Sequence, residues 1–224
     1  MLTFQSGGRS VRLAAYEPLS APSRSKPVPA ILLLHGAGGN VDFWLGRVAP
    51  LVNRAGVAVY AAHYFDRTGT ERASPAHLAD GIHVPQWLGT AQDALTVIAA
   101  RATVDSERIA LLGISLGAFL SLALGTQLPA GTIRAIVEIS GGLVPPFEHA
   151  ATSAFPPTLI VHGEADTVVP VAHAHSLAER LKKLNVEHQQ KLLPGEGHWF
   201  SAAAQDSILQ AVALFLATHL LSTS

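Results

Sequence analysis

The segment from Ile109 to Leu128 constrains the fold of this chain more than any other. An apolar run ends in Gly113-Ile114-Ser115-Leu116-Gly117, and a helix-like stretch follows at once. Glycines lack side chains, so two backbones can pass close together beside a strained serine. The pattern Gly-x-Ser-x-Gly between a strand and a helix predicts a nucleophilic serine in a sharp turn. The alternative at this point is a turn whose serine caps the helix.

Short apolar runs alternate with helix-like stretches along most of the chain. Continuous apolar runs are typical of strands that are covered on both faces, as in parallel sheets. Their alternation with helices predicts an α/β protein with a mainly parallel sheet. We expect strands at 30–35, 57–63, 109–114, 133–139, 158–162 and 187–193, and helices at 42–55, 85–101, 116–128, 172–184 and 201–221.

Three segments depart from this alternation. Residues 2–5 and 10–16 flank Gly7-Gly8 and predict an antiparallel hairpin. Residues 17–29, rich in Pro and Ser, are expected to form a surface loop. Residues 64–84 are irregular and polar, and a loop of this length is uncommon unless it is functional.

Length and composition narrow the class of protein. The chain has 224 residues, of which 49% are hydrophobic and 14% charged, and we expect one domain over residues 1–224. A net charge of -1 gives no positive electrostatic potential that would attract nucleic acid or anionic lipid. There is no cysteine, no secretory signal and no apolar run of membrane-spanning length. We expect a cytoplasmic protein, monomeric or homodimeric, without nucleic-acid or membrane partners.

Several residues with useful chemistry follow directly after predicted strands. In parallel sheets, ligands bind outside the carboxyl ends of the strands, so these residues should gather at one edge. They are His35-Gly36-Ala37, Arg67, Ser115, Asp166 and His198.

A serine hydroxyl is a weak nucleophile, and it needs a base that is oriented by a third group. The order Ser115, Asp166, His198 predicts that the serine attacks an acyl carbonyl and the histidine moves its proton, while the aspartate fixes the imidazole. The alternative for Asp166 is an N-cap of the next helix. Rival acids are Glu138, within a strand, and Glu164.

The other histidines need separate interpretations. His35 ends a strand and is expected to make structural hydrogen bonds. His63 and His83 flank the long polar loop and are candidates to line a pocket. His173 and His175 are two positions apart, which places them on different helix faces, and no His-Glu-x-x-His occurs, so we predict no metal site.

The oxyanion of an acyl-transfer reaction needs preorganised N–H donors. Leu116, directly after the serine, supplies one, and Ala37 in the glycine-rich turn is the expected second. That turn is not a nucleotide-binding motif, because Gly-Lys-Ser/Thr is missing and Val41 stands where Gly-x-Gly-x-x-Gly needs its last glycine. We predict no cofactor.

These motifs resemble the α/β-hydrolase superfamily and, within it, the dienelactone hydrolase-like group. The resemblance covers residues 28–220. It implies an α/β-hydrolase fold with seven or eight strands, helices on both faces and no large cap domain. The residues that carry it are His35-Gly36, Gly113-Ile114-Ser115-Leu116-Gly117, His162-Gly163-x-x-Asp166-x-x-Val169-Pro170 and Gly197-His198-Trp199-Phe200.

The chain departs from that group in two ways. Dienelactone hydrolases proper use a cysteine where this chain has Ser115, and they bind a substrate carboxylate with two arginines. Arg67 is a match for one arginine, whereas the other position falls in Ser201-Ala202-Ala203-Ala204. The resemblance therefore implies a serine carboxylesterase acting on small to medium acyl groups.

Other functions stay open. The same triad serves thioesterases, amidases, peptidases and dienelactone hydrolase-type enzymes, and an idle hydrolase fold can serve in binding. Trp87, Trp199, Phe119 and residues 143–155 are candidates to line the substrate pocket, and the alternative for each is ordinary packing.

Overall fold

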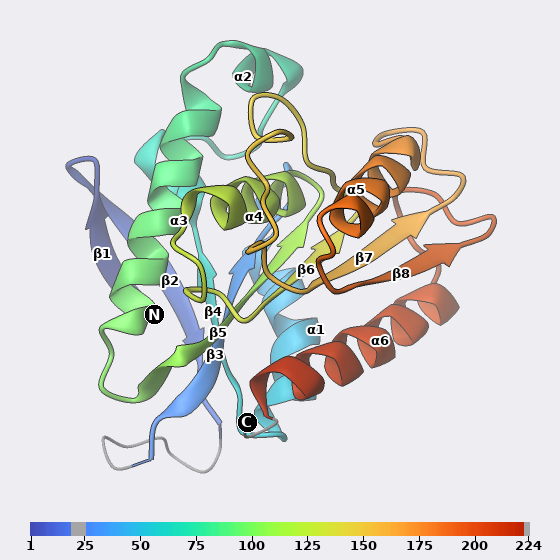
Figure 1. Cartoon of the computed structure of the whole chain (residues 1–224). Coiled ribbons are helices and arrows are strands. Elements are labelled where there is room, and N and C mark those ends of the chain that lie inside the picture. The colour runs from blue at the N-terminus through green and yellow to red at the C-terminus, as the bar shows by residue number, and fades with distance from the viewer. Residues whose placement is uncertain (19–25, 222–224) are drawn as a thin grey trace.

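One eight-stranded sheet organises the computed structural model, which describes residues 1–18 and 26–221 (Figure 1). The strand order is β1-β2-β4-β3-β5-β6-β7-β8. Strands β1 and β2 pair antiparallel with each other, and β2 pairs antiparallel with β4. The pairs from β4 to β8 are all parallel. The strands are β1 Leu2–Ser6, β2 Arg9–Tyr16, β3 Val28–Leu34, β4 Ala58–Ala62, β5 Val104–Ile114, β6 Ala135–Ile139, β7 Thr158–Gly163 and β8 His188–Leu193.

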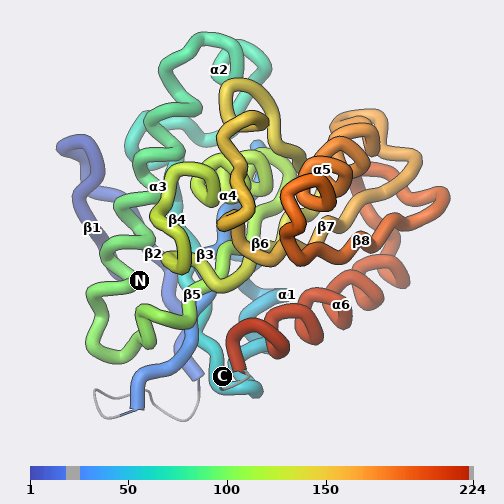
Figure 2. Tube along the Cα trace, in the orientation of Figure 1, coloured from blue at the N-terminus to red at the C-terminus, as the bar shows by residue number. Residues whose placement is uncertain are grey.

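Helices cover both faces of the sheet, as Figures 1 and 2 show. Helices α3, α4 and α5 pack on one face, and α1 and α6 pack on the other. The helices are α1 Val41–Asn53, α2 Pro75–Ala79, α3 His83–Ala99, α4 Leu116–Gln127, α5 Ala172–Lys183 and α6 Ala202–Leu220. The predicted α/β-hydrolase fold, with its N-terminal hairpin, is confirmed, and no large cap domain covers the described residues.

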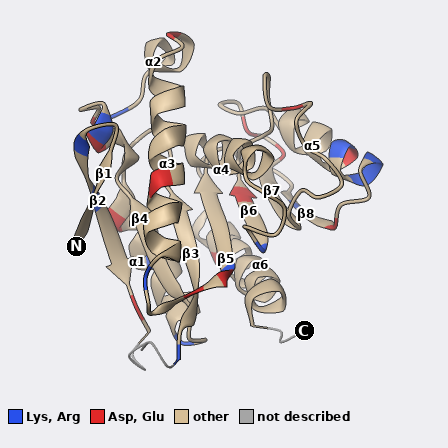
Figure 3. Cartoon of the chain, turned by 60° about the vertical axis from the view of Figure 1, so that its left-hand side comes forward, with Lys and Arg blue, Asp and Glu red and all other residues tan. Residues whose placement is uncertain are grey.

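Each face of the sheet has its own hydrophobic core, because alternate side chains of a strand point to opposite faces. In β3, Leu32 and Leu34 belong to the core under α3 and α4, while Ile31 and Leu33 belong to the core under α1 and α6. Helix α4 carries no charged residue and is drawn entirely in tan in Figure 3. Such a helix needs cover on several sides, which β5, β6 and α3 provide.

The long polar segment 64–84 differs from its prediction as a loop. It contains a 3₁₀ turn, η1 Tyr64–Arg67, and the short helix α2. Helix α3 begins at His83 rather than at Pro85. The reason is Asp80, whose carboxylate accepts hydrogen bonds from the backbone N–H groups of Ile82 and His83 at 2.8 and 3.0 Å.

The structure describes only part of one predicted loop. The predicted surface loop at 17–29 lies partly outside the described residues, and its last part forms the start of β3. Within residues 1–18 and 26–221, no helix combines the length and the hydropathy that crossing a bilayer would need.

The turn between β5 and α4 is held by contacts that only glycine permits. A Cβ on Gly117 would overlap the backbone carbonyl oxygen of Leu34 in β3, and a Cβ on Gly113 would overlap the carbonyl oxygen of Gly117. Neither neighbour is the end of a flexible side chain, so neither can move aside. The sequence at the turn is therefore fixed by the approach of β3 to α4.

We expect Gly117→Ala to lower the free energy of unfolding by roughly 2 kcal/mol or more, since overpacking against backbone forces the sheet apart. The matched control is Gly46→Ala, at an exposed position in α1 with open space around it. There the same substitution should add about 0.5–1 kcal/mol through helix propensity. Urea unfolding of both variants checks this; equal stability of Gly117→Ala and the wild type would contradict the packing.

Candidate active site

Ser115 stands in a strained backbone conformation between β5 and α4. Its φ is 53° and its ψ is -117°, a region that costs a non-glycine residue on the order of 1–3 kcal/mol. The Ser115 N–H donates to the carbonyl of Ile139 in β6 at 2.8 Å, and the Ser115 carbonyl accepts from the N–H groups of Ala118 and Phe119. The surrounding strands and helix thus fix a turn that directs the hydroxyl away from the sheet.

Three distant side chains form one hydrogen-bonded chain at the carboxyl edge of the sheet. His198 Nε2 lies 3.1 Å from Ser115 Oγ, and His198 Nδ1 lies 2.7 Å from Asp166 Oδ2. Ser115 follows β5, Asp166 follows β7 and His198 follows β8. The structure therefore brings together all three residues that the sequence order predicts.

The Asp166 carboxylate is held from several directions. Its Oδ1 accepts hydrogen bonds from the backbone N–H groups of Val168 and Val169, both at 2.8 Å. Burial alone would raise the pKa of Asp166, but the bonds from His198, Val169 and Val168 lower that pKa below its ordinary value. The carboxylate is thus ionised, and it can orient the imidazole and stabilise its positive form.

His162 is a neighbour of the Asp166 carboxylate to which the sequence analysis assigns no role. His162, the last-but-one residue of β7, is completely buried and places its Nε2 3.5 Å from Asp166 Oδ2. The same nitrogen donates to the carbonyl of Val169 at 2.8 Å, which ties the loop after Asp166 to the strand. The signal was present, because His162 opens the motif that contains Asp166.

The two expected oxyanion donors come from the serine turn and from the turn after β3. Leu116 is the first residue of α4, so its N–H has no partner within the helix. Ala37 lies after β3, and its carbonyl accepts from the N–H of Ala73. In the described part of the chain, neither amide donates to another backbone group. Both donors are therefore available to a ligand.

His35 has the structural place that the sequence predicts. Its side chain is buried and stacks on Tyr64 with ring centroids 4.1 Å apart, and its Nδ1 donates to the carbonyl of Gly36 at 2.8 Å. Burial lowers the pKa of His35 to about 4, so the imidazole is neutral. The Tyr64 hydroxyl donates to the His35 carbonyl at 2.6 Å, which anchors the oxyanion turn.

Two apolar cavities open beside the triad. One, of about 240 Å³, lies between α1 and α6 and is lined by His198, Trp199 and Trp44. The other, of about 680 Å³, lies between α3 and α4 and is lined by Leu116, Phe119 and residues 143–147. Trp199 and Phe119 thus lie where the sequence expects pocket residues.

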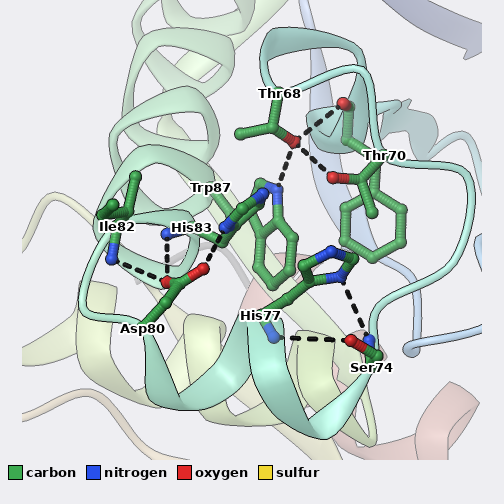
Figure 4. A network of polar contacts seen from close by, with 9 residues as sticks. Thr68, Thr70, Ser74, His77, Asp80, Ile82, His83 and Trp87 are labelled. Atoms are coloured by element: carbon green, nitrogen blue, oxygen red, sulfur yellow. Dashed lines mark hydrogen bonds and ion pairs between the residues drawn. The ribbon is translucent and has the colours of Figure 1, made fainter.

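Trp87, by contrast, is not a pocket residue. Its side chain is 0% exposed, and its ring packs against Phe65 with centroids 4.7 Å apart. The indole N–H donates to Thr68 Oγ1 at 2.9 Å (Figure 4). The prediction is wrong because the Trp87 ring, on α3, packs against η1 and is bonded to Thr68, so that it connects these two elements and is buried.

The histidines around this segment have different places. His83 Nδ1 pairs with Asp80 Oδ2 at 2.5 Å (Figure 4), and it lines neither cavity beside the triad. His63 lines a separate polar cavity of about 470 Å³ together with His35 and Asp66. Within the described residues, no group of three or more His, Asp or Glu side chains is placed to hold a metal ion.

The Arg67 side chain is held by the N-terminal hairpin and α3. Its Nη1 donates to Ser6 Oγ of β1 at 3.2 Å, and its guanidinium packs against Gly7 and Gly89. Arg67 lines neither cavity beside the triad. The prediction that Arg67 binds substrate is corrected, because the N-terminal hairpin supplies its partner.

Glu138, the rival acid, has a different place. It is completely buried in β6, where Oε2 accepts from the N–H of Gly141 at 2.9 Å and, among the described residues, Oε1 has no partner. Burial raises the pKa of Glu138 to about 8. A neutral carboxyl here holds the turn after β6, against which Ala118 of α4 packs.

We expect Arg67→Ala to leave the preference between anionic and neutral esters unchanged within about twofold, because the guanidinium contacts Ser6 rather than a substrate. Stability should fall by about 1 kcal/mol through the lost hydrogen bond. Comparing kcat/KM for a matched pair of such esters checks this. A selective loss of activity on the anionic ester would show instead that Arg67 binds the substrate carboxylate.

Glu138→Gln should flatten the dependence of stability on pH. In the unfolded chain the carboxyl releases its proton near 4.5, whereas in the folded protein it holds the proton up to about 8. Stability should therefore fall as pH rises between these values in the wild type. The glutamine variant should be spared roughly 1–4 kcal/mol of that loss. Urea unfolding at both ends of the range tests this.

Glu164→Gln is the matched control for that experiment, because Glu164 is exposed beside β7. It should follow the wild-type pH profile. A Glu138→Gln profile that also follows the wild type would show that this carboxyl is not held protonated.

Known proteins resemble this chain in sequence and in fold. The sequence profile of the Dienelactone hydrolase family matches residues 15–217. The proposed carbamate hydrolase RutD of Escherichia coli (strain UTI89 / UPEC) is 28% identical over 130 residues, which span 58% of this chain and 42% of RutD. Esterase LipC of Mycobacterium tuberculosis is 42% identical over 65 residues, 27% of this chain and 16% of LipC. The chain thus spans less than half the length of these two relatives.

Solved structures share the fold over nearly the whole chain. Est1E from Butyrivibrio proteoclasticus has a TM-score of 0.79 at 16% identity, with 99% of both chains covered. A dienelactone hydrolase-like promiscuous phosphotriesterase from metagenomic libraries has a TM-score of 0.80 at 20% identity, with 97% and 96% covered. From the match over residues 15–217, together with the fold, the chain belongs to the dienelactone hydrolase family.

Proposed function

We propose that the protein is a serine hydrolase that cleaves carboxylic esters through an acyl-enzyme on Ser115. The observation that carries this is the continuous hydrogen-bonded chain from Ser115 Oγ through the His198 ring to Asp166 Oδ2. Nucleophile, base and orienting acid are each within the reach that proton transfer needs.

The first half of the reaction forms the acyl-enzyme. Ser115 Oγ attacks the ester carbonyl while His198 Nε2 takes the hydroxyl proton, so that a tetrahedral intermediate forms. Its negative oxygen accepts hydrogen bonds from the N–H groups of Leu116 and Ala37. His198 then gives the proton to the leaving alcohol, and the bond between the acyl carbon and that alcohol breaks.

The second half releases the acid. Water enters where the alcohol stood, loses a proton to His198 and attacks the acyl carbon. The bond to Ser115 Oγ breaks, and His198 returns the proton to that oxygen. Throughout, Asp166 keeps the proton of the ring on Nδ1, which leaves Nε2 free to accept. The low pKa of Asp166 supports this role, because only the ionised carboxylate stabilises a positive imidazole.

Thioester, amide and peptide hydrolysis use the same triad and stay open as alternatives. Dienelactone hydrolase-type activity is less well supported, since Arg67 is paired with Ser6 and the serine replaces a cysteine. A non-catalytic binding role is disfavoured by the assembled triad. The single domain, the cytoplasmic location, the absence of a cofactor and the monomeric or homodimeric state stay predictions.

Ser115→Ala should lower kcat for p-nitrophenyl acetate by a factor on the order of 10³ or more and abolish labelling by a fluorophosphonate probe. The matched control is Ser176→Ala, an exposed serine on α5, which should keep full activity and labelling. Mass spectrometry of the labelled peptide identifies the residue that reacts. Equal turnover by Ser115→Ala and the wild type would rule out the acyl-enzyme.

A further inference from the structure

The geometry of the intermediate decides which cavity holds which part of an ester. Four groups surround the acyl carbon: Ser115 Oγ, the negative oxygen, the leaving oxygen and the acyl chain. The leaving oxygen must be within reach of His198, because this ring donates the proton to it. The negative oxygen faces the N–H of Leu116. The alcohol therefore lies on the side of His198, and the acyl chain takes the remaining direction, for which the cavity lined by Leu116 and not by His198 is the available space.

The cavity on the Leu116 side is a groove along α4, which we name the α3–α4 groove. Four residues of one stripe of α4 line it, Leu116, Phe119, Leu120 and Ala123, and Gln127 continues the stripe. At 1.5 Å per residue, the groove follows the helix for about 16 Å from the oxyanion donor. With a volume of about 680 Å³, it falls in the range of sites that enclose drug-sized ligands.

The groove is largely apolar, and Gln92 and Gln127 are the polar side chains among its lining residues. Its floor on α3 includes Val84 and Leu88, and its roof is formed by Leu78 of α2 and by residues 143–147. In the described residues, no Asp, Glu, Lys or Arg side chain lines it. Figure 3 shows the same absence of charge along α4. A charged acyl group would lose its hydration there without gaining a partner.

The part of the roof formed by α2 is held in place by hydrogen bonds at both ends of this helix. Ser74 caps α2, with its Oγ accepting from the N–H of His77, while Asp80 and His83 join α2 to α3 (Figure 4). Leu78 is held at the rim with 47% of its surface exposed. The segment 74–83 therefore covers part of the groove, although no large cap domain is present among the described residues.

The cavity on the His198 side is smaller and also largely apolar. Its volume is about 240 Å³, and aromatic rings such as Trp44 and Trp199 line it together with Arg47. It suits a compact alcohol better than a long chain. The two cavities thus differ chiefly in size, as do the long acyl chain and the compact alcohol of an asymmetric ester.

We propose that the preferred substrates are esters of an extended, uncharged aliphatic acid with a compact alcohol, and that the acyl chain lies in the α3–α4 groove. This inference rests on the proposed serine hydrolase function. It adds a substrate class and assigns the groove as the site that selects acyl chain length.

The test measures kcat/KM for p-nitrophenyl esters of acetate, butyrate, octanoate and dodecanoate. Burial of each CH₂ can raise kcat/KM by up to about fourfold, so a rise of at least about tenfold from butyrate to octanoate is expected. A second series keeps the acetyl group and lengthens the alcohol from methyl to octyl, and it should show no such rise.

The groove is tested with Leu78→Glu, an exposed position where folding is not at risk. This charge at the rim should lower the ratio of kcat/KM for octanoate to that for acetate at least about threefold. Leu214→Glu is the matched control, because Leu214 is an exposed leucine on α6, on the other face of the sheet. It should leave the whole series unchanged.

A second variant, Gln127→Trp, fills the far end of the groove at an exposed helix terminus. It should reduce the rate on dodecanoate more than on butyrate. A flat acyl series in the wild type, or unchanged selectivity in both groove variants, overturns the inference. So does a chain-length effect confined to the alcohol series, which would place the alcohol in the groove. If no ester is cleaved at all, the proposed function itself has failed.

Discussion

The close approach of β3 to the start of α4 is the contact on which the site depends. Gly117 lies against the carbonyl of Leu34, and no residue with a Cβ fits there. This approach allows Ser115 to adopt a positive φ of 53° with its N–H bonded to β6. The turn after β3, which carries Ala37, also lies close to the nucleophile, since a Cβ on Gly36 would lie 3.4 Å from the Ser115 Cβ. One backbone contact therefore sets both the nucleophile and the expected oxyanion donors.

The parallel sheet distributes the remaining parts. Strands β5, β7 and β8 end at the same edge, so loops far apart in sequence meet there. Apolar strands with a core on each face fix the strand ends, and short polar contacts between the loops close the site. The bond of 2.7 Å from His198 to Asp166 is one of these.

Sequence patterns predicted the backbone well and the side-chain directions poorly. The elbow around Ser115 and the order of Asp166 and His198 follow from local rules, because glycine spacing and strand ends are visible in the sequence. Arg67 and Trp87 were misplaced for a different reason. Their positions after β4 and in α3 were read correctly, but their directions depend on Ser6 and Thr68, partners that no local pattern reveals. The groove roof was missed because segment 64–84 has no clear period.

The two buried carboxylates near the elbow explain why the sequence needs an aspartate after β7 and tolerates a glutamate within β6. Asp166 has several donors around it, so its pKa falls and it carries a charge that the imidazole can use. Glu138 has one donor, the N–H of Gly141, and burial drives its pKa up to about 8. Opposite environments give one charged and one neutral acid. Among the described residues His198 Nδ1 is bonded to Asp166 and Glu138 is bonded to Gly141, so Asp166 is the acid that orients the ring.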